Sequence, residues 1–297
     1  MIRPYATVSV DLDPVDLHLL GYGVRGLAPD LLVYDVALPR LLDRCARAGV
    51  RATFFCVGRD AQARAAALGR IAAEGHEVAS HSLTHPLALS RLPAEALRCE
   101  LVESRRRLEA ATGFPVGGFR APNFDVDARV LREVAAAGYR YDASGYPTPL
   151  LAAARVVLAL RGRDPAGVLR LRLLPHSLAR RPHRHPAAGG LVEFPASVTP
   201  VARWPVYHTL RLLGGPGPTR RRIEALARRR ESLSYTVHAV DALGLAEDGV
   251  DPRLAPHPGM GLALAEKLSA LDEVLGLVTA RFEVATFADR LARGDPA

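Results

Sequence analysis

The residues with the clearest chemical potential are two aspartates, Asp11 and Asp13, which stand two positions apart after the run 6–10. That run alternates, is rich in β-branched residues and lies between Pro4 and Pro14, so it predicts a strand. Side chains two apart on a strand share a face, so both carboxylates can enter one cavity. Two such anions repel unless a cation or a proton neutralises one, which indicates a metal ligand beside a general base. Taken alone, the pair is more simply explained as an Asp-Pro turn.

Two histidines, His81 and His85, stand four positions apart after an apolar run that follows Gly75. Imidazoles at this spacing can bind one ion, as in the zinc-protease motif, but Ser82 occupies the position of that motif's catalytic Glu. The pair alone could equally be accidental. With Asp13 the set becomes two nitrogens and one oxygen, which suits Zn²⁺ or another borderline divalent ion and leaves positions for water and substrate. Open positions favour a catalytic metal over a structural one.

Further motifs follow in an order that resembles the polysaccharide deacetylase family, also called the NodB-homology or carbohydrate esterase family 4 fold. The resemblance extends from about Tyr5 to about Leu291. The matching segments, in chain order, are Asp11 with Asp13, His81 with His85, Arg120-Ala-Pro122, Tyr141-Asp142-Ala-Ser144 and Thr236-Val-His238. Leu12 separates aspartates that are adjacent in the common form of the family, and Asn123 stands where many members carry Tyr or Trp. The first departure resembles the branch of some peptidoglycan deacetylases and allantoinase-like proteins, and the second leaves the substrate open.

The resemblance implies a metal site and a general base. Asp13, His81 and His85 would hold one divalent metal ion, zinc first, with Co, Ni, Fe or Mn as alternatives. The ion would turn a bound water into a nucleophile near neutral pH. Asp11 would take the proton of that water as general base. Arg120 would pair with Asp11 through a charge-assisted hydrogen bond that keeps the carboxylate ionised and oriented.

The resemblance also implies an oxyanion donor and a general acid. The tetrahedral oxyanion would lie on the metal and on a backbone N–H just after Pro122, that of Asn123. His238 would protonate the leaving amine, and Asp142 would hold His238 in the required tautomer. Each residue has a simpler alternative: Arg120 as a surface charge, Pro122 and Asp142 as turn residues, His238 as a polar strand end. Their joint order favours the site.

Strand-like runs alternate with helical patterns in this α/β chain, with helices expected over 37–48, 61–74, 94–112 and 127–137. This alternation predicts parallel strands wrapped by helices, with catalytic residues at the carboxyl ends of the strands. The family resemblance implies a distorted (β/α) barrel of about seven units, in a single catalytic domain over 1–297. Two insertions, about 15–36 and 145–190, exceed a minimal barrel, and we expect the first to form a lid or pocket wall.

Composition limits the partners. The net charge of +8 favours an anionic substrate, such as a phosphate-bearing or lipid-linked sugar. In the second insertion, the apolar segment 150–160 precedes arginines, so peripheral contact with anionic lipid is one option. That segment is too short to span a bilayer, and packing on the barrel explains it as well. No nucleic-acid-binding motif accompanies the charge, so we expect no nucleic-acid partner.

The expected first strand begins within a few residues of Met1, which leaves no secretory signal segment. Three cysteines, an odd number, indicate reduced core thiols. We therefore expect a cytoplasmic protein, with the inner face of the membrane as an option, that removes an acetyl or formyl group from the nitrogen of an amino sugar. The alternatives are hydrolysis of a non-sugar amide, as in the allantoinase-like branch, and a non-catalytic carbohydrate- or lipid-binding barrel. The oligomeric state stays open.

Overall fold

The computed structural model describes residues 3–150, 156 and 175–295. One sheet runs through these residues in the order β6-β7-β5-β4-β3-β2-β1-β8, and β9 pairs with β1. All pairs are parallel except β6 with β7. The strands are β1 (Tyr5–Leu12), β2 (Thr53–Cys56), β3 (Glu77–Ser80), β4 (Gly118–Phe119), β5 (Tyr141–Asp142), β6 (His183–His185), β7 (Leu191–Glu193), β8 (Leu233–His238) and β9 (Glu283–Val284).

The sheet curves until the chain after β7 meets β8. The Ser197 N–H donates to the Ser234 carbonyl at 3.4 Å, and the Ser234 N–H donates to Ser197 Oγ at 2.9 Å. These contacts close a barrel whose parallel neighbours run from β8 through β1, β2, β3, β4 and β5 to β7. The predicted distorted barrel is therefore confirmed, and its closure by short, irregular strands is the distortion.

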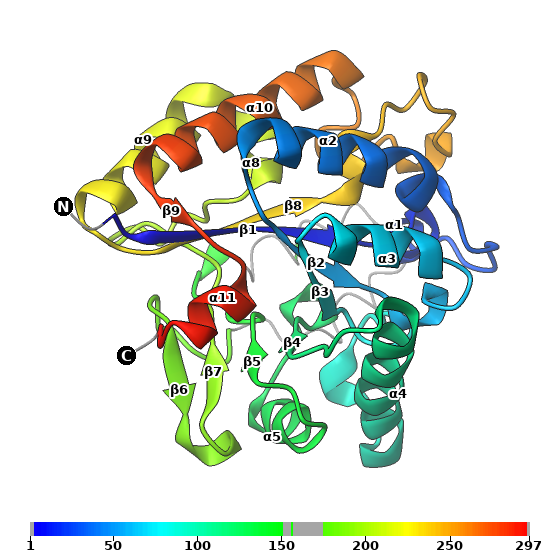
Figure 1. Ribbon diagram of the computed structural model, residues 1–297. Coiled ribbons are helices and arrows are strands. Elements are labelled where there is room, and N and C mark those ends of the chain that lie inside the picture. The colour runs from blue at the N-terminus through cyan, green and yellow to red at the C-terminus, as the bar shows by residue number, and fades with distance from the viewer. Residues whose placement is uncertain (1–2, 151–155, 157–174, 296–297) are drawn as a thin grey trace.

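Helices cover the outside of this sheet (Figure 1). They are α1 (Val15–Gly21), α2 (Leu38–Ala48), α3 (Ala65–Ala73), α4 (Ala94–Thr112), α5 (Ala128–Ala136), α8 (His208–Gly214), α9 (Pro216–Arg228), α10 (Leu264–Arg281) and α11 (Phe287–Ala292). The four helices expected from the pattern correspond to α2, α3, α4 and α5. Asp127 caps α5 by accepting from the Val130 N–H, which explains why that helix begins where it does.

The two faces of β1 divide the molecule into a core and a barrel interior. Val8 and Val10 face outward and belong to the main apolar core under the helices. Thr7, Ser9 and Asp11 alternate with them and point inward, as the period of two requires. At the amino end of the barrel a second apolar cluster contains α11 side chains together with Phe55, Tyr141 and Phe194. The interior is thus apolar at one end and polar at the carboxyl ends of the strands.

The first insertion contains α1 and a π-helical turn, Val33–Ala37, that continues into α2. Residues 151–155 and 157–174 of the second insertion, which include most of the apolar segment 150–160 and the first arginines, lie outside the described residues. No helix in the described part of the chain is long and apolar enough to cross a membrane.

Cys45 and Cys56 are buried and free, as expected. Cys99 is exposed, because it lies on the solvent face of α4 opposite the buried Leu97 and Leu101.

Candidate active site

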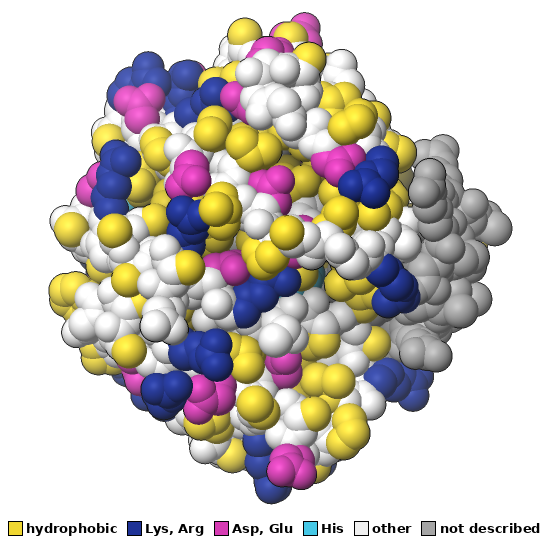
Figure 2. Space-filling view, turned by 90° about the vertical axis from the view of Figure 1, so that its right-hand side faces the viewer, with side chains coloured by type: hydrophobic (Ala, Val, Ile, Leu, Met, Phe, Trp, Pro, Cys, Tyr) yellow, Lys and Arg dark blue, Asp and Glu magenta, His cyan; other side chains and the backbone are white. Residues whose placement is uncertain are grey.

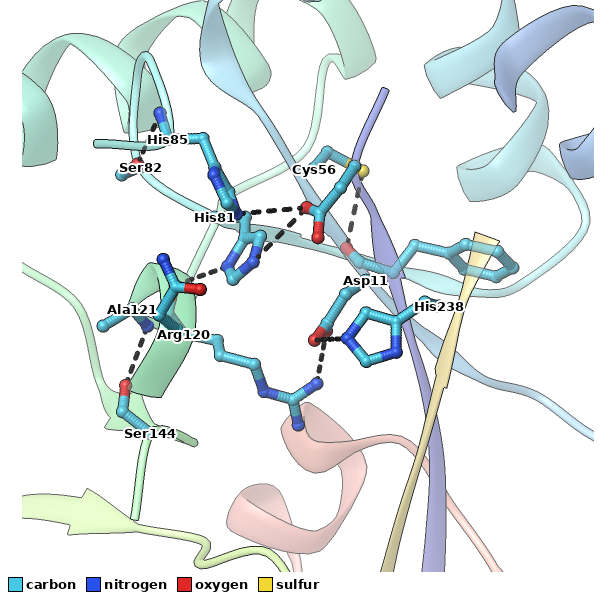
Figure 3. Close-up of polar contacts among 12 residues, drawn as sticks. Asp11, Cys56, His81, Ser82, His85, Arg120, Ala121, Ser144 and His238 are labelled. Carbon is cyan, nitrogen blue, oxygen red and sulfur yellow. Dashed lines mark hydrogen bonds and ion pairs between the residues drawn. The ribbon is translucent and has the colours of Figure 1, made fainter. Parts of the chain in front are cut away.

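Asp13, His81 and His85 form a compact cluster at the carboxyl end of the barrel. Asp13 follows β1 and His81 follows β3, and all three side chains are buried. Asp13 Oδ1 lies 3.4 Å from His81 Nε2 and 3.6 Å from His85 Nε2. Two atoms that each lie about 2.0–2.2 Å from a tetrahedral ion are about 3.3–3.6 Å apart, so these separations fit one bound zinc. Figure 3 shows both imidazoles pointing toward the same carboxylate.

The hydrogen bonds of these ligand atoms also fit a cation. His81 Nδ1 donates to the Arg120 carbonyl at 2.7 Å, which leaves the Nε2 lone pair facing Asp13. Asp13 Oδ1 is buried without a hydrogen-bond partner among the described residues, which is costly for a carboxylate oxygen. Burial lowers the pKa of His81 and lowers that of His85 to about 4, so both rings are neutral, as ligands must be.

A strained turn brings the two histidines together. Ser82 and His85 have positive φ angles of 64° and 57°, and the Ser82 hydroxyl accepts from the His85 N–H at 3.1 Å. Glu100 on α4 holds this turn: its carboxylate accepts from the Leu83 N–H, the Thr84 N–H and the Thr84 hydroxyl. The sequence analysis did not find Glu100, because nothing in a helical Glu indicates which loop it contacts.

Arg120 joins the predicted base to the barrel wall. Its Nη1 donates to Asp11 Oδ1 at 2.5 Å, Nη2 donates to Ser9 Oγ at 3.1 Å, and Nε donates to the Ala143 carbonyl at 3.1 Å. The guanidinium lies 4.0 Å above the centre of the Phe55 ring. Burial is the largest influence and acts to raise the pKa of Asp11, but the charges of Arg120, His81 and His238 together outweigh it and lower the pKa. Asp11 is therefore ionised, as predicted for a carboxylate paired with arginine, and its role as general base stays a prediction.

His238 lines the same cavity as the Asp13–His81–His85 cluster. It is the register partner of Asp11 in the β1–β8 pair, and its Nε2 lies 3.9 Å from Asp11 Oδ2. Its side chain is 22% exposed, so it can meet a substrate. Figure 3 shows His238 and Arg120 approaching Asp11 from different sides.

The predicted contact of Asp142 with His238 is absent, which corrects that part of the site. His238 Nδ1 has no hydrogen-bond partner among the described residues. Asp142 instead accepts from the Ser144 N–H at 3.0 Å and the Ser144 hydroxyl at 2.6 Å. The reason is the strand order, since β4, β3, β2 and β1 separate β5 from β8 along that side of the sheet. Ser144 Oγ accepts in turn from the Ala121 N–H, so Asp142 supports the loop of the Arg120 motif.

Asn123 also lies at the site. It lines the cavity beside the Arg120 motif and has a left-handed backbone, with φ 54°. Its side-chain amide donates to the Leu87 carbonyl at 3.2 Å, which fixes the loop. The role of its backbone N–H as an oxyanion donor stays a prediction.

A cavity of about 330 Å³ opens above these residues. The first insertion contributes Leu17, His18 and Tyr22 to its lining, so the prediction of a pocket wall there is confirmed. Other lining residues were missed by sequence reasoning: Leu87, Phe124, Tyr146, Tyr207, His257 and Pro258. His257 lies 5.0 Å from His18 between ring centres, and no pattern marks it beyond a Pro-rich loop. Burial lowers the pKa of both histidines, so they face the cavity as neutral hydrogen-bonding groups.

Residues 32–141 match the family model for polysaccharide deacetylase. The expected resemblance is confirmed. A chitooligosaccharide deacetylase from Sinorhizobium fredii is 38% identical over 76 residues, 26% of this chain and 35% of that protein. A peptidoglycan-N-acetylglucosamine deacetylase from Bacillus cereus is 30% identical over 84 residues, 28% of this chain and 30% of that protein. The similarity to these relatives thus spans about a third of their length.

The whole fold is also similar to a solved structure. A protein from Mycobacterium smegmatis that has been assigned as a polysaccharide deacetylase is 18% identical, with a TM-score of 0.62, over 99% of this chain and 91% of that one. This likeness concerns the fold. The family match includes His81, His85 and Arg120 but ends before β8 and begins after β1. It is the barrel that adds Asp11, Asp13 and His238 to the same cavity.

We expect His81→Ala to release one equivalent of bound zinc per chain, because it removes one of the three ligand atoms around Asp13. Elemental analysis after dialysis against zinc measures this. The matched control is His257→Ala, which removes another buried histidine of the same cavity and should keep the ion. Retention of the full zinc content in His81→Ala would show that the ion binds elsewhere.

Removing the Arg120 guanidinium should leave the Asp11 carboxylate buried without its charge partner. We expect Arg120→Met to lower the free energy of unfolding by about 3–5 kcal/mol at pH 7, measured by chemical denaturation with a chelator present. The lowered pKa of Asp11 means that the pair stabilises the fold above the ordinary carboxyl pKa and loses its effect as pH falls through the lowered value.

The loss in Arg120→Met should therefore shrink toward low pH. The control is Arg98→Met, which breaks an exposed pair with Glu133 and should change stability little. A loss at Arg120 that is small, or that stays the same from pH 7 to acid, would contradict a buried ion pair with Asp11.

Proposed function

We propose that this protein is a metal-dependent amidohydrolase that removes an acetyl or formyl group from the nitrogen of an amino sugar. The observation that carries the proposal is the meeting of three elements in one cavity: the Asp13–His81–His85 cluster, the arginine-paired Asp11, and His238. The similarity to two relatives that are sugar deacetylases supports it. Each element answers one need of amide hydrolysis.

A divalent ion held by Asp13, His81 and His85 would supply a Lewis acid and lower the pKa of a bound water. Asp11 accepts the proton of the attacking water, because Arg120 keeps its carboxylate ionised and aimed into the cavity. The other Asp11 oxygen faces His238, so it does not compete with Asp13 for the ion. The two aspartates thereby divide the work between ligand and base, as their different surroundings require.

The remaining residues handle the acyl oxygen and the leaving amine. His238 donates a proton from Nε2 to the departing nitrogen, which its exposed edge can reach. The loop after Pro122 supplies the backbone N–H of Asn123 to the developing oxyanion. Asp142 acts through Ser144 on this loop, and it is a positioning residue.

The cavity lining favours a sugar over a non-sugar amide. Phe124 and Tyr146 stack with ring centres 4.7 Å apart, and Tyr207 meets Tyr146 edge-on at 6.2 Å. Aromatic faces of this kind pack against the C–H faces of sugar rings, and the neutral His18 and His257 offer partners for hydroxyls. The volume lies at the lower end for small-molecule sites, so we propose that one acylated sugar unit fills it.

Charge and location enter the proposal separately. We propose an anionic substrate, carried on a nucleotide or a lipid, because the chain has a net charge of +8. Figure 2 shows basic and acidic side chains interspersed with apolar ones on one face, so the charge is not gathered into one patch there. The cytoplasmic location and the membrane contact stay predictions. A non-catalytic binding protein would have lost the general base or a metal ligand, whereas Asp11, Asp13, His81 and His85 are all present.

Two substitutions test the division of roles, with acetate and formate release measured on a panel of free, nucleotide-linked and lipid-linked N-acyl amino sugars. We expect Asp11→Asn to abolish release while zinc stays bound, because the amide cannot take the proton. His238→Ala should keep zinc and lower kcat by about 10²–10⁴, the usual contribution of a general acid.

Zinc lost from Asp11→Asn would make Asp11 a ligand instead of a base. An unchanged kcat in His238→Ala would assign the acid to another residue. Zinc binding by the unaltered protein without release from any sugar in the panel would favour the non-sugar amide.

A further inference from the structure

A second cluster of ligand-type side chains lies at the antiparallel edge of the sheet. His185 belongs to β6, Glu193 to β7, and His176 to the chain that leads into β6. Glu193 Oε2 lies 3.3 Å from His185 Nε2 and 3.6 Å from His176 Nε2. None of these residues lines the active-site cavity. Figure 1 shows β6 and β7 as a hairpin at the far end of the sheet from β8.

The separations in this cluster repeat those of the active site. Asp13 Oδ1 lies 3.4 and 3.6 Å from the Nε2 atoms of its two histidines, and Glu193 Oε2 lies 3.3 and 3.6 Å from those of its two histidines. Both sets match the edge of a tetrahedron of ligands around zinc, about 3.3–3.6 Å. Both sets also consist of two imidazole nitrogens and one carboxylate oxygen, a donor set that suits a borderline divalent ion.

Burial makes an empty cluster costly. The Glu193 side chain is fully buried, and those of His176 and His185 are 8% and 18% exposed. His176 Nε2 is buried and has no hydrogen-bond partner among the described residues. At 3.6 Å it is too far from Glu193 Oε2 for a hydrogen bond. Glu193 Oε2 already lies at hydrogen-bond distance from His185 Nε2, so His176 Nε2 is the atom that an ion would provide with a partner.

The second carboxylate oxygen of Glu193 already has a partner. Glu193 Oε1 accepts from the Gly145 N–H at 2.9 Å, which leaves Oε2 to face the two histidines. Glu193 Oε2 is therefore the carboxylate oxygen that an ion between the two histidines would meet.

We propose that His176 Nε2, His185 Nε2 and Glu193 Oε2 form a second binding site for a divalent metal ion, of the zinc class, with its fourth position on the solvent side near His185. An ion at this site would fasten the chain at 176 to the β6–β7 hairpin. The proposal is independent of the deacylase activity, because it uses no residue of the catalytic cluster.

The second site is linked to the cavity wall through Gly145. Glu193 holds the Gly145 N–H, and the next residue, Tyr146, is one of the aromatic rings of the cavity. An ion that orients Glu193 therefore fixes the position of Tyr146. On the proposed function, in which the Tyr146 ring packs against the sugar, loss of the ion should weaken substrate binding more than turnover.

Zinc stoichiometry tests the proposal directly. We expect two zinc ions per chain in the unaltered protein, one in Asp13→Ala, one in His185→Gln and none in the double variant, by elemental analysis after dialysis. The matched control is His183→Gln on the same strand, whose Nδ1 contacts the Arg181 carbonyl and which lies outside the ligand set. That variant should keep two.

A thermal measurement covers the case in which His185→Gln misfolds. Added zinc should raise the melting temperature of Asp13→Ala by several degrees, because this chain retains only the second site. The same addition to Asp13→Ala/His176→Gln should give no rise, and chelator should reverse the first effect. One zinc per unaltered chain with no thermal shift in Asp13→Ala would overturn the second site and leave the catalytic proposal untouched. Two zinc ions without deacylation would do the opposite.

Discussion

The site depends on one buried cation, Arg120. Its guanidinium binds Asp11, Ser9 and the Ala143 carbonyl, and its own carbonyl accepts from His81 Nδ1. One residue therefore sets the charge and direction of Asp11 and the tautomer of His81. A buried guanidinium is tolerable only with such a full set of partners, so the barrel interior must be polar at this level. The Phe55 ring packs against the guanidinium and adds a cation–π contact.

The barrel brings these partners together. The period of two on β1 places Ser9 and Asp11 on the inner face, and the register with β8 puts His238 opposite Asp11. The β3–β4 register pairs Ser80 with Phe119, so the next residues on each strand, His81 and Arg120, meet at the carboxyl end. Four separate stretches of sequence thus meet at one site because parallel strands end at one rim.

Much of what lies at strand ends could be predicted from the sequence. Periodicity predicted the helices α2 to α5 and parallel strands, and residue types and spacing predicted the Asp13 cluster. The family resemblance implied the distorted barrel and the Arg120–Asp11 pair. They could not predict contacts that depend on strand order, and Asp142 was therefore assigned to His238, although it contacts Ser144 and Glu193. Loop residues were also missed. His257 lies on a loop, and no periodicity in the sequence indicates that this loop reaches the cavity. His176 belongs to the second insertion, and only the folded chain shows that it lies beside Glu193 of β7.

The central claim is that Asp13, His81 and His85 hold an ion beside a metal-free Asp11. Anomalous diffraction at the zinc absorption edge, from crystals grown with zinc, tests it most directly. The account predicts a peak about 2.0–2.2 Å from Asp13 Oδ1 and from both Nε2 atoms, with Asp11 still bound to Arg120. A peak bonded to Asp11, or no peak between the two histidines, would contradict it.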